Sequence, residues 1–161
     1  MNIALLGNGH VAQALINIID EEKHVLISYD RNSNFDEIPL SPIIDIVIDM
    51  LAHNNEAVQI SKNIIKGSLY YGKSVITCNK KLMNIYGAEL CNFAKDTSGK
   101  FYINSLVASS NTFIPYPEYL SIYNFIDNSD KESIFQYRGA GPEETAKFIN
   151  DEITRIETNE K

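Results

Sequence analysis

Basic residues are scarce in this sequence. Lysine and arginine together number 14 against 21 aspartates and glutamates, the formal net charge is −7, and Lys80-Lys81 is the one adjacent basic pair. A protein that binds a nucleic acid backbone needs basic side chains gathered on one face. We therefore expect no nucleic acid partner.

Cysteine and histidine are also few. The two cysteines, Cys78 and Cys91, have neither CxxC spacing nor the density of a disulfide-stapled secreted protein. The three histidines, His10, His24 and His53, are far apart and lack metal-ligand spacing. The sequence predicts a reducing compartment and no metal site.

Long apolar runs are absent. The run at the start of the chain, residues 3–6, has four residues and ends at a glycine, which is too short for the apolar core of a signal peptide. A transmembrane helix needs about 18 or more consecutive apolar residues, and the sequence has no such run. We expect a cytoplasmic protein that does not contact membranes.

Short apolar runs alternate with segments of helical periodicity. We expect strands over residues 3–6, 25–27, 43–51, 74–77, 101–107 and 133–138, and helices over 9–20, 55–70, 82–96 and from 142 onward. Strands alternating with helices at short spacing predict an α/β fold with a doubly wound, mostly parallel sheet. Such a sheet binds its ligand at the carboxyl ends of the strands.

A glycine loop, Gly7-Asn8-Gly9-His10-Val11-Ala12, joins the first strand to the first helix. The first glycine of such a loop permits a tight turn, the second lets backbone N–H groups approach a pyrophosphate, and the third position needs a small side chain. Gly7, Gly9 and Ala12 meet these needs. The loop predicts a Rossmann-type NAD(P)-binding fold, and a purely structural turn is the alternative.

Asp30 ends the second strand, 18 residues past Ala12. An acidic side chain there would accept a hydrogen bond from the adenosine ribose and favour NAD, whereas the neighbouring Arg31 could hold the 2′-phosphate of NADP. The sequence is compatible with either NAD or NADP. A solvated turn is the alternative interpretation of these residues.

Asn79 and Lys80 follow the fourth strand, which places them at the expected ligand edge. They could polarise a carbonyl group or hold a cofactor hydroxyl, and Lys80 is our candidate for a catalytic cation. The alternative for Lys80 is a solvated lysine at the start of a helix. The late turn Gly139-Ala140-Gly141 also precedes a helix, but the acidic Glu143 and Glu144 disfavour a phosphate there.

Five segments in order resemble homoserine dehydrogenase, an α/β oxidoreductase that interconverts homoserine and aspartate semialdehyde with NAD(P). They read IALLGNGHVAQAL, IDIVIDML, GKSVITCNKKLMNIYGAELCNFA, YINSLVAS and RGAGPEETAKFINDEI. The combination of a T-x-N-K segment with a terminal G-A-G-x-x-x-T-A segment makes the resemblance specific. It covers most of residues 1–108 and about 134–157.

The resemblance implies roles for particular residues. Lys80 would match a conserved lysine near the nicotinamide and the substrate, and Gly139 a late glycine that touches the cofactor. The residues that would line the cofactor phosphates are Gly7, Asn8, Gly9, His10 and Val11.

The chain departs from this family at residue 104 and between residues 109 and 130. A short aromatic-rich connection stands there in place of the large substrate domain, and Asn104 replaces a glutamate that the family associates with a monovalent metal ion. These departures imply that the homoserine site is missing and that no metal is bound.

We therefore expect one dinucleotide-binding domain over residues 1–161. Its parts would be a Rossmann core over 1–108, the connection over 109–130, and a final strand and helix over 131–161 that complete the core. One functional hypothesis is a truncated homoserine dehydrogenase-like oxidoreductase. The alternative is a non-catalytic nucleotide-binding module that acts through a partner.

The aromatic segment 113–125 bears on this choice. In a binding module it would form an interface with a second copy of the chain or with a partner chain. A lid packed over the edge of the sheet is the alternative.

Overall fold

The computed structural model of the chain describes residues 1–52, 54–103, 120–126, 132–138 and 141–159. Five parallel strands form the main sheet in the order β2-β1-β3-β4-β5. The strands are β1 (Asn2–Leu6), β2 (Val25–Tyr29), β3 (Ile46–Asp49), β4 (Ser74–Thr77) and β5 (Lys100–Ile103). The α/β, doubly wound parallel sheet is confirmed.

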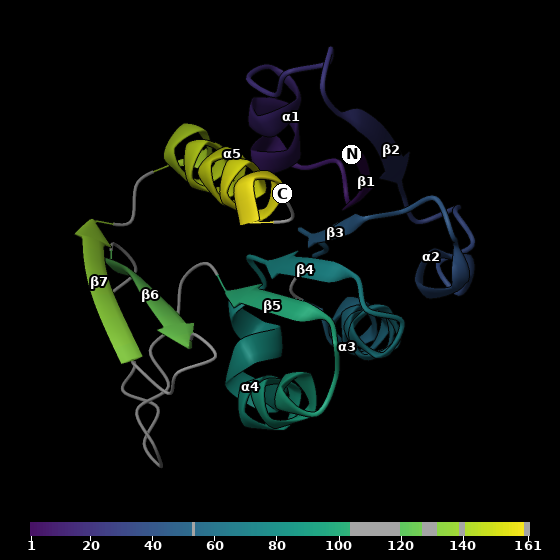
Figure 1. Ribbon diagram of the computed structural model, residues 1–161, viewed down its shortest axis with the longest axis vertical. Helices are drawn as coiled ribbons and strands as arrows, with labels where there is room; N and C mark the ends of the chain where they lie inside the picture. Colours follow the sequence, from purple (N-terminus) through teal and green to yellow (C-terminus); the bar gives the residue numbers. More distant parts are fainter. Residues whose placement is uncertain (53, 104–119, 127–131, 139–140, 160–161) are drawn as a thin grey trace.

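Helices cover both faces of this sheet (Figure 1). One face carries α1 (His10–Ile16) and α5 (Pro142–Asn159), and the other carries α2 (Glu37–Leu40), α3 (Asn55–Tyr70) and α4 (Lys80–Lys95). Because side chains alternate along a strand, Ile3 and Leu5 pack in the cluster with α1 and α5, whereas Ala4 and Leu6 pack with α3 and α4. Residues 3–6, the apolar part of β1, are thus buried on both faces.

The last helix completes one of these layers. Its apolar residues recur three or four positions apart, which places them on one face of α5. They pack in the same cluster as Leu15 of α1, and all are fully buried: Ala146, Ile149, Ile153 and Ile156. The last helix expected from the sequence therefore belongs to the core.

Most expected elements are present with small shifts at their ends. The bounds of α3 and β4 are as expected, α4 begins at Lys80 rather than at residue 82, and α1 ends at Ile16 rather than at residue 20. The short helix α2 lies in a segment for which we expected neither a helix nor a strand. Its Ile38 is fully buried in the cluster with α3, which explains why this turn of helix is stable.

The expectation for the final strand is wrong in one respect. A strand does form at β7 (Glu132–Arg138), but it pairs antiparallel with β6 (Leu120–Ile126) in a separate two-stranded sheet, instead of completing the parallel sheet. Residues 120–126, which we expected to be part of the irregular connection, form a strand. Alternation of apolar residues predicts a strand but does not specify its partner.

His24 is a buried histidine just before β2. It is 6% exposed, and its Nδ1 atom has no hydrogen-bond partner among the described residues. Burial, together with the nearby N-terminal ammonium group, lowers the pKa of His24 below its usual value. The folded protein therefore favours the neutral imidazole.

This burial predicts a pH-dependent stability. The unfolded chain binds a proton at His24 below about pH 6.5, where the folded protein resists protonation, so the free energy of unfolding should fall as the pH drops from about 7 to about 5.5. Urea unfolding at intervals across this range would measure the loss. The variant His24→Gln should flatten the profile, and an equally steep profile in the variant would contradict this role.

Candidate functional site

The order of the strands marks one edge of the sheet as special. β1 has β2 on one side and β3 on the other, and the chain leaves β1 toward α1 on one face but leaves β3 toward α3 on the opposite face. Open α/β sheets bind ligands at the carboxyl ends of the strands at such a switch point. The glycine loop that follows β1 lies at this position.

Gly7 holds the glycine loop against both neighbouring strands. Its φ angle is +96°, and a Cβ atom at this position would lie 2.7 Å from the backbone oxygen of Met50, just after β3. On the other side, the Gly7 N–H group donates to the carbonyl oxygen of Tyr29 at 2.9 Å. Only glycine fits here without strain, as expected from the sequence.

Gly9 has a different environment. It is exposed and extended, with φ −71° and ψ −174°, and a Cβ atom there would have no heavy atom within 4 Å. No contact among the described residues therefore requires glycine at this position. The open space is what close approach of a ligand to the backbone needs. Asn8 and His10 on either side are also exposed, whereas Val11 is partly buried against the core.

Asp30 lies next to the glycine loop, because it follows Tyr29, the residue that accepts the hydrogen bond from Gly7. Its Oδ1 atom accepts hydrogen bonds from the Asn32 N–H group at 2.9 Å and from the Ser33 hydroxyl at 3.2 Å. These bonds form the expected turn and leave Oδ2 facing no donor among the described residues. Arg31 is exposed and forms no ion pair within the described part of the chain.

Asn79 lies at the end of β4 and caps α4. It is 1% exposed, and its Oδ1 atom accepts a hydrogen bond from the Leu82 N–H group at 3.1 Å. Its Nδ2 atom has no partner among the described residues. A buried donor without an acceptor costs about 1–3 kcal/mol, so a ligand oxygen at this position would be stabilising. Lys80, the next residue, is exposed at the start of the helix.

Asp49 is a site residue that the sequence analysis missed. This aspartate ends β3, is fully buried, and accepts hydrogen bonds from the Ser61 and Thr77 hydroxyls at 2.8 and 2.9 Å. A further bond comes from the Leu51 N–H group at 3.2 Å. The signal was available, because a single acidic residue ends an apolar strand at the ligand edge in IDIVIDML.

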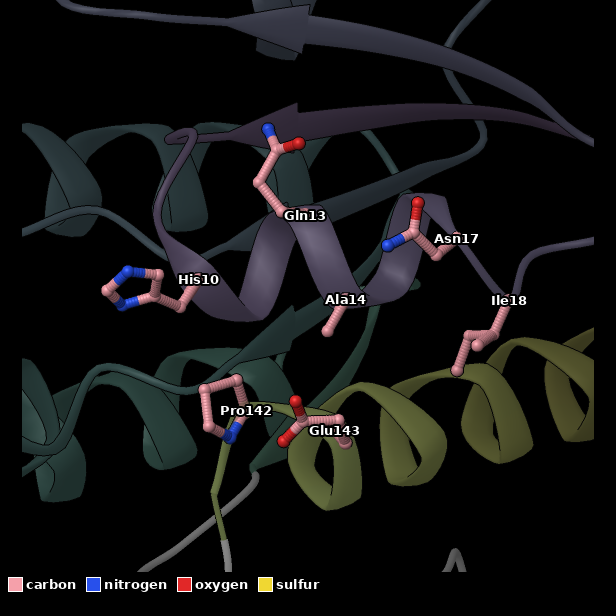
Figure 2. Close-up of a pocket in the computed structure, with 7 residues that line it drawn as sticks. All are labelled: His10, Gln13, Ala14, Asn17, Ile18, Pro142 and Glu143. Carbon is pink, nitrogen blue, oxygen red and sulfur yellow. The ribbon is translucent and has the colours of Figure 1, made fainter.

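A groove between α1 and α5 adjoins the glycine loop (Figure 2). His10, at the start of α1, lines it opposite Pro142 and Glu143, at the start of α5. The structure thus brings together two segments that are far apart in the sequence. Gly139, which we expected to contact the cofactor, comes shortly before Pro142 in the sequence but lies outside the described residues. Asn104 and residues 113–119 of the aromatic segment also lie outside them.

Two absences hold for the part of the chain that the structure describes. No helix there has the length and apolar character needed to cross a membrane. No group of three or more histidine, cysteine, aspartate or glutamate side chains is arranged to hold a metal ion.

Comparisons with known proteins agree with the fold described above. No protein-family model and no curated protein matches the chain, but solved structures do. A homoserine dehydrogenase from S. aureus at pH 6.0 matches with a TM-score of 0.65 and 12% identity, over 98% of this chain and 76% of that one. The chain shares the fold of homoserine dehydrogenases.

Other structures show the same likeness over a shorter stretch. The S. aureus homoserine dehydrogenase at pH 8.5 matches with a TM-score of 0.52 and 20% identity, over 66% of this chain and 33% of that one. A biliverdin reductase from Synechocystis, in complex with biliverdin and NADP+, matches with a TM-score of 0.51 and 16% identity, over 63% and 37%. The chain spans about a third of the length of these two proteins. The expected likeness in fold to homoserine dehydrogenases and the Rossmann-type fold are confirmed.

The two glycines of the loop should respond differently to substitution. Gly7→Ala places a methyl group against the Met50 oxygen at a positive φ angle, so it should lower the free energy of unfolding by about 1–3 kcal/mol. Gly9→Ala meets no neighbour among the described residues and should cost less than about 1 kcal/mol. Urea unfolding of the two variants measures both values. Equal losses would contradict the tight approach of Gly7 to β3.

Proposed function

We propose that the chain binds a nicotinamide dinucleotide, NAD or NADP, at the carboxyl edge of its parallel sheet. The pyrophosphate lies on the glycine loop, and the residues that line it are Gly7, Asn8, Gly9, His10 and Val11. The observation that carries the proposal is the open space at Gly9 beside the tightly held Gly7, at the switch point of the sheet. Residues 1–161 act as a single cofactor-binding domain.

The adenosine ribose lies beside Asp30 in this arrangement. The Oδ2 atom of Asp30, which faces no donor among the described residues, accepts a hydrogen bond from a ribose hydroxyl, which favours NAD, while the exposed Arg31 is available for the 2′-phosphate of NADP. The hydrogen bonds from Asn32 and Ser33 to Asp30 Oδ1 support this role, because they hold the carboxylate in place next to the loop.

The nicotinamide half lies toward Asn79 and Lys80, and Gly139 is a further proposed cofactor contact. When bound, the nicotinamide ring would supply hydride transfer. Asn79 offers a buried amide donor, and Lys80 offers an exposed cation that can donate a hydrogen bond or a proton to a reacting oxygen. The fold shared with homoserine dehydrogenases and a biliverdin reductase supports an oxidoreductase relationship.

Turnover needs a substrate site in addition to the cofactor site. The connection over residues 109–130 is short for a substrate domain, so we propose a homoserine dehydrogenase-like protein in which the substrate site is rebuilt from this segment or supplied by a partner. The aromatic segment 113–125 is the proposed contact with a second copy of the chain or with another chain. The proposed location is the cytoplasm.

Thermal unfolding with added cofactors tests the binding proposal. NAD, NADP or their reduced forms should raise the unfolding temperature of the purified protein, since a ligand at about 100 times its Kd stabilises by about 2.7 kcal/mol. Gly9→Ala should fold normally yet lose most of the shift, because its methyl group enters the space that the backbone offers to the pyrophosphate. A wild-type protein that shows no shift with any of the four cofactors would refute the proposal.

Absorbance of the nicotinamide band separates an enzyme from a binding module. Homoserine with the oxidised cofactor, and aspartate semialdehyde with the reduced one, are the substrates to assay. Turnover that Lys80→Ala abolishes, with the thermal shift retained, would identify the chain as an oxidoreductase. A thermal shift without turnover would identify it as a nucleotide-binding module.

A further inference from the structure

A line of buried polar groups joins β3, β4 and α4 at the carboxyl edge of the sheet. The Thr77 hydroxyl lies 2.9 Å from Asp49 Oδ2, and the Asn79 N–H group donates to Thr77 Oγ1 at 3.2 Å. Asp49, Thr77 and Asn79 are at most 1% exposed. Three polar residues with so little access to water have little freedom to rearrange.

The direction of each hydrogen bond follows from the chemistry of the groups. The Thr77 hydroxyl donates its proton to Asp49 Oδ2, and its lone pairs remain for the Asn79 N–H group, which can only donate. The other carboxylate oxygen of Asp49 is held by Ser61 and Leu51. Asp49 therefore fixes the orientation of the Thr77 hydroxyl, and this hydroxyl fixes the backbone of Asn79.

The side chain of Asn79 is fixed as well. Its amide must turn Oδ1 toward the Leu82 N–H group, which can only donate, so the other amide atom is Nδ2. That nitrogen lacks an acceptor among the described residues although it is buried. A rigidly held, buried donor at the ligand edge fits an acceptor oxygen of a ligand and offers nothing to a ligand cation.

We propose that Asp49 is a positioning residue that acts through Thr77 to aim the amide of Asn79 at an oxygen of the bound dinucleotide. The oxygen belongs to a ribose hydroxyl or to the carboxamide of the nicotinamide. This inference rests on the dinucleotide binding proposed above and adds the residues that preorganise the cofactor site. Asp49 itself does not touch the ligand.

The test measures the Kd of NAD and NADP by titration calorimetry, with the unfolding temperature of each free protein as the structural readout. Asn79→Ser keeps a helix-capping oxygen but removes the amide donor, so we expect about 10-fold weaker binding. Thr77→Val and Asp49→Asn each break the hydrogen-bond chain from Asp49 through Thr77 to Asn79, and each should weaken binding about five-fold. The double variant that carries both substitutions should have a Kd no higher than that of the weaker-binding single variant, because both changes break the same chain.

Two matched controls separate positioning from general stability. Thr77→Ser keeps the hydroxyl and should bind within about two-fold of wild type. Ser61→Ala removes a different hydrogen bond to Asp49 and leaves Thr77 in place, so it should lower the unfolding temperature without changing the Kd.

Three results would overturn the inference, and they are distinguishable. A wild-type protein that binds neither cofactor refutes the proposed function and this inference together. Wild-type affinity in Thr77→Val and Asn79→Ser refutes the inference while dinucleotide binding stands. An equal loss of affinity in Ser61→Ala and Thr77→Val would show that the Kd depends on the general stability of the hydrogen bonds around Asp49. The orientation of the Asn79 amide through Thr77 would then not be the cause.

Discussion

The close approach of Gly7 to the end of β3 is the constraint on which the rest of this structure depends. The backbone of Gly7 turns at a positive φ angle, its N–H group is bonded to Tyr29, and its Cα lies where any side chain would strike the Met50 oxygen. The ends of three strands are thereby held together at one point. The loop can then lead directly into α1 while β3 leads to the opposite face.

The polar residues at the two edges of the sheet therefore have different roles. The carboxyl edge gathers the exposed Gly9, the Asp30 turn, and the buried Asp49, Thr77 and Asn79. At the amino edge, Lys73 has a structural role. Its ammonium group donates to the backbone oxygens of Ser41 and Ile44, and burial lowers its pKa. Asn79 Nδ2, a buried donor without a partner among the described residues, lies at the edge where a ligand is proposed to bind.

Much of this arrangement could be predicted from the sequence, because local patterns determine it. The spacing of Gly7, Gly9 and Ala12 predicted the loop, and apolar periodicity predicted α3 and β4 with their observed bounds. The partner of β7 could not be predicted, since alternation does not specify which strand pairs with it. Nor could the α2 turn, which depends on burial of one residue, Ile38, against α3. Asp49 gains its role only through hydroxyls 12 and 28 residues away.

Amide chemical shifts on titration with a nicotinamide dinucleotide test the central claim most directly. The account predicts that the largest changes occur at Gly7, Gly9, Asp30 and Asn79, on the carboxyl edge of the sheet. Val25, the first residue of β2, and Lys73, the residue just before β4, should not change. Changes centred on the amino edge, or none at a saturating cofactor concentration, would contradict it.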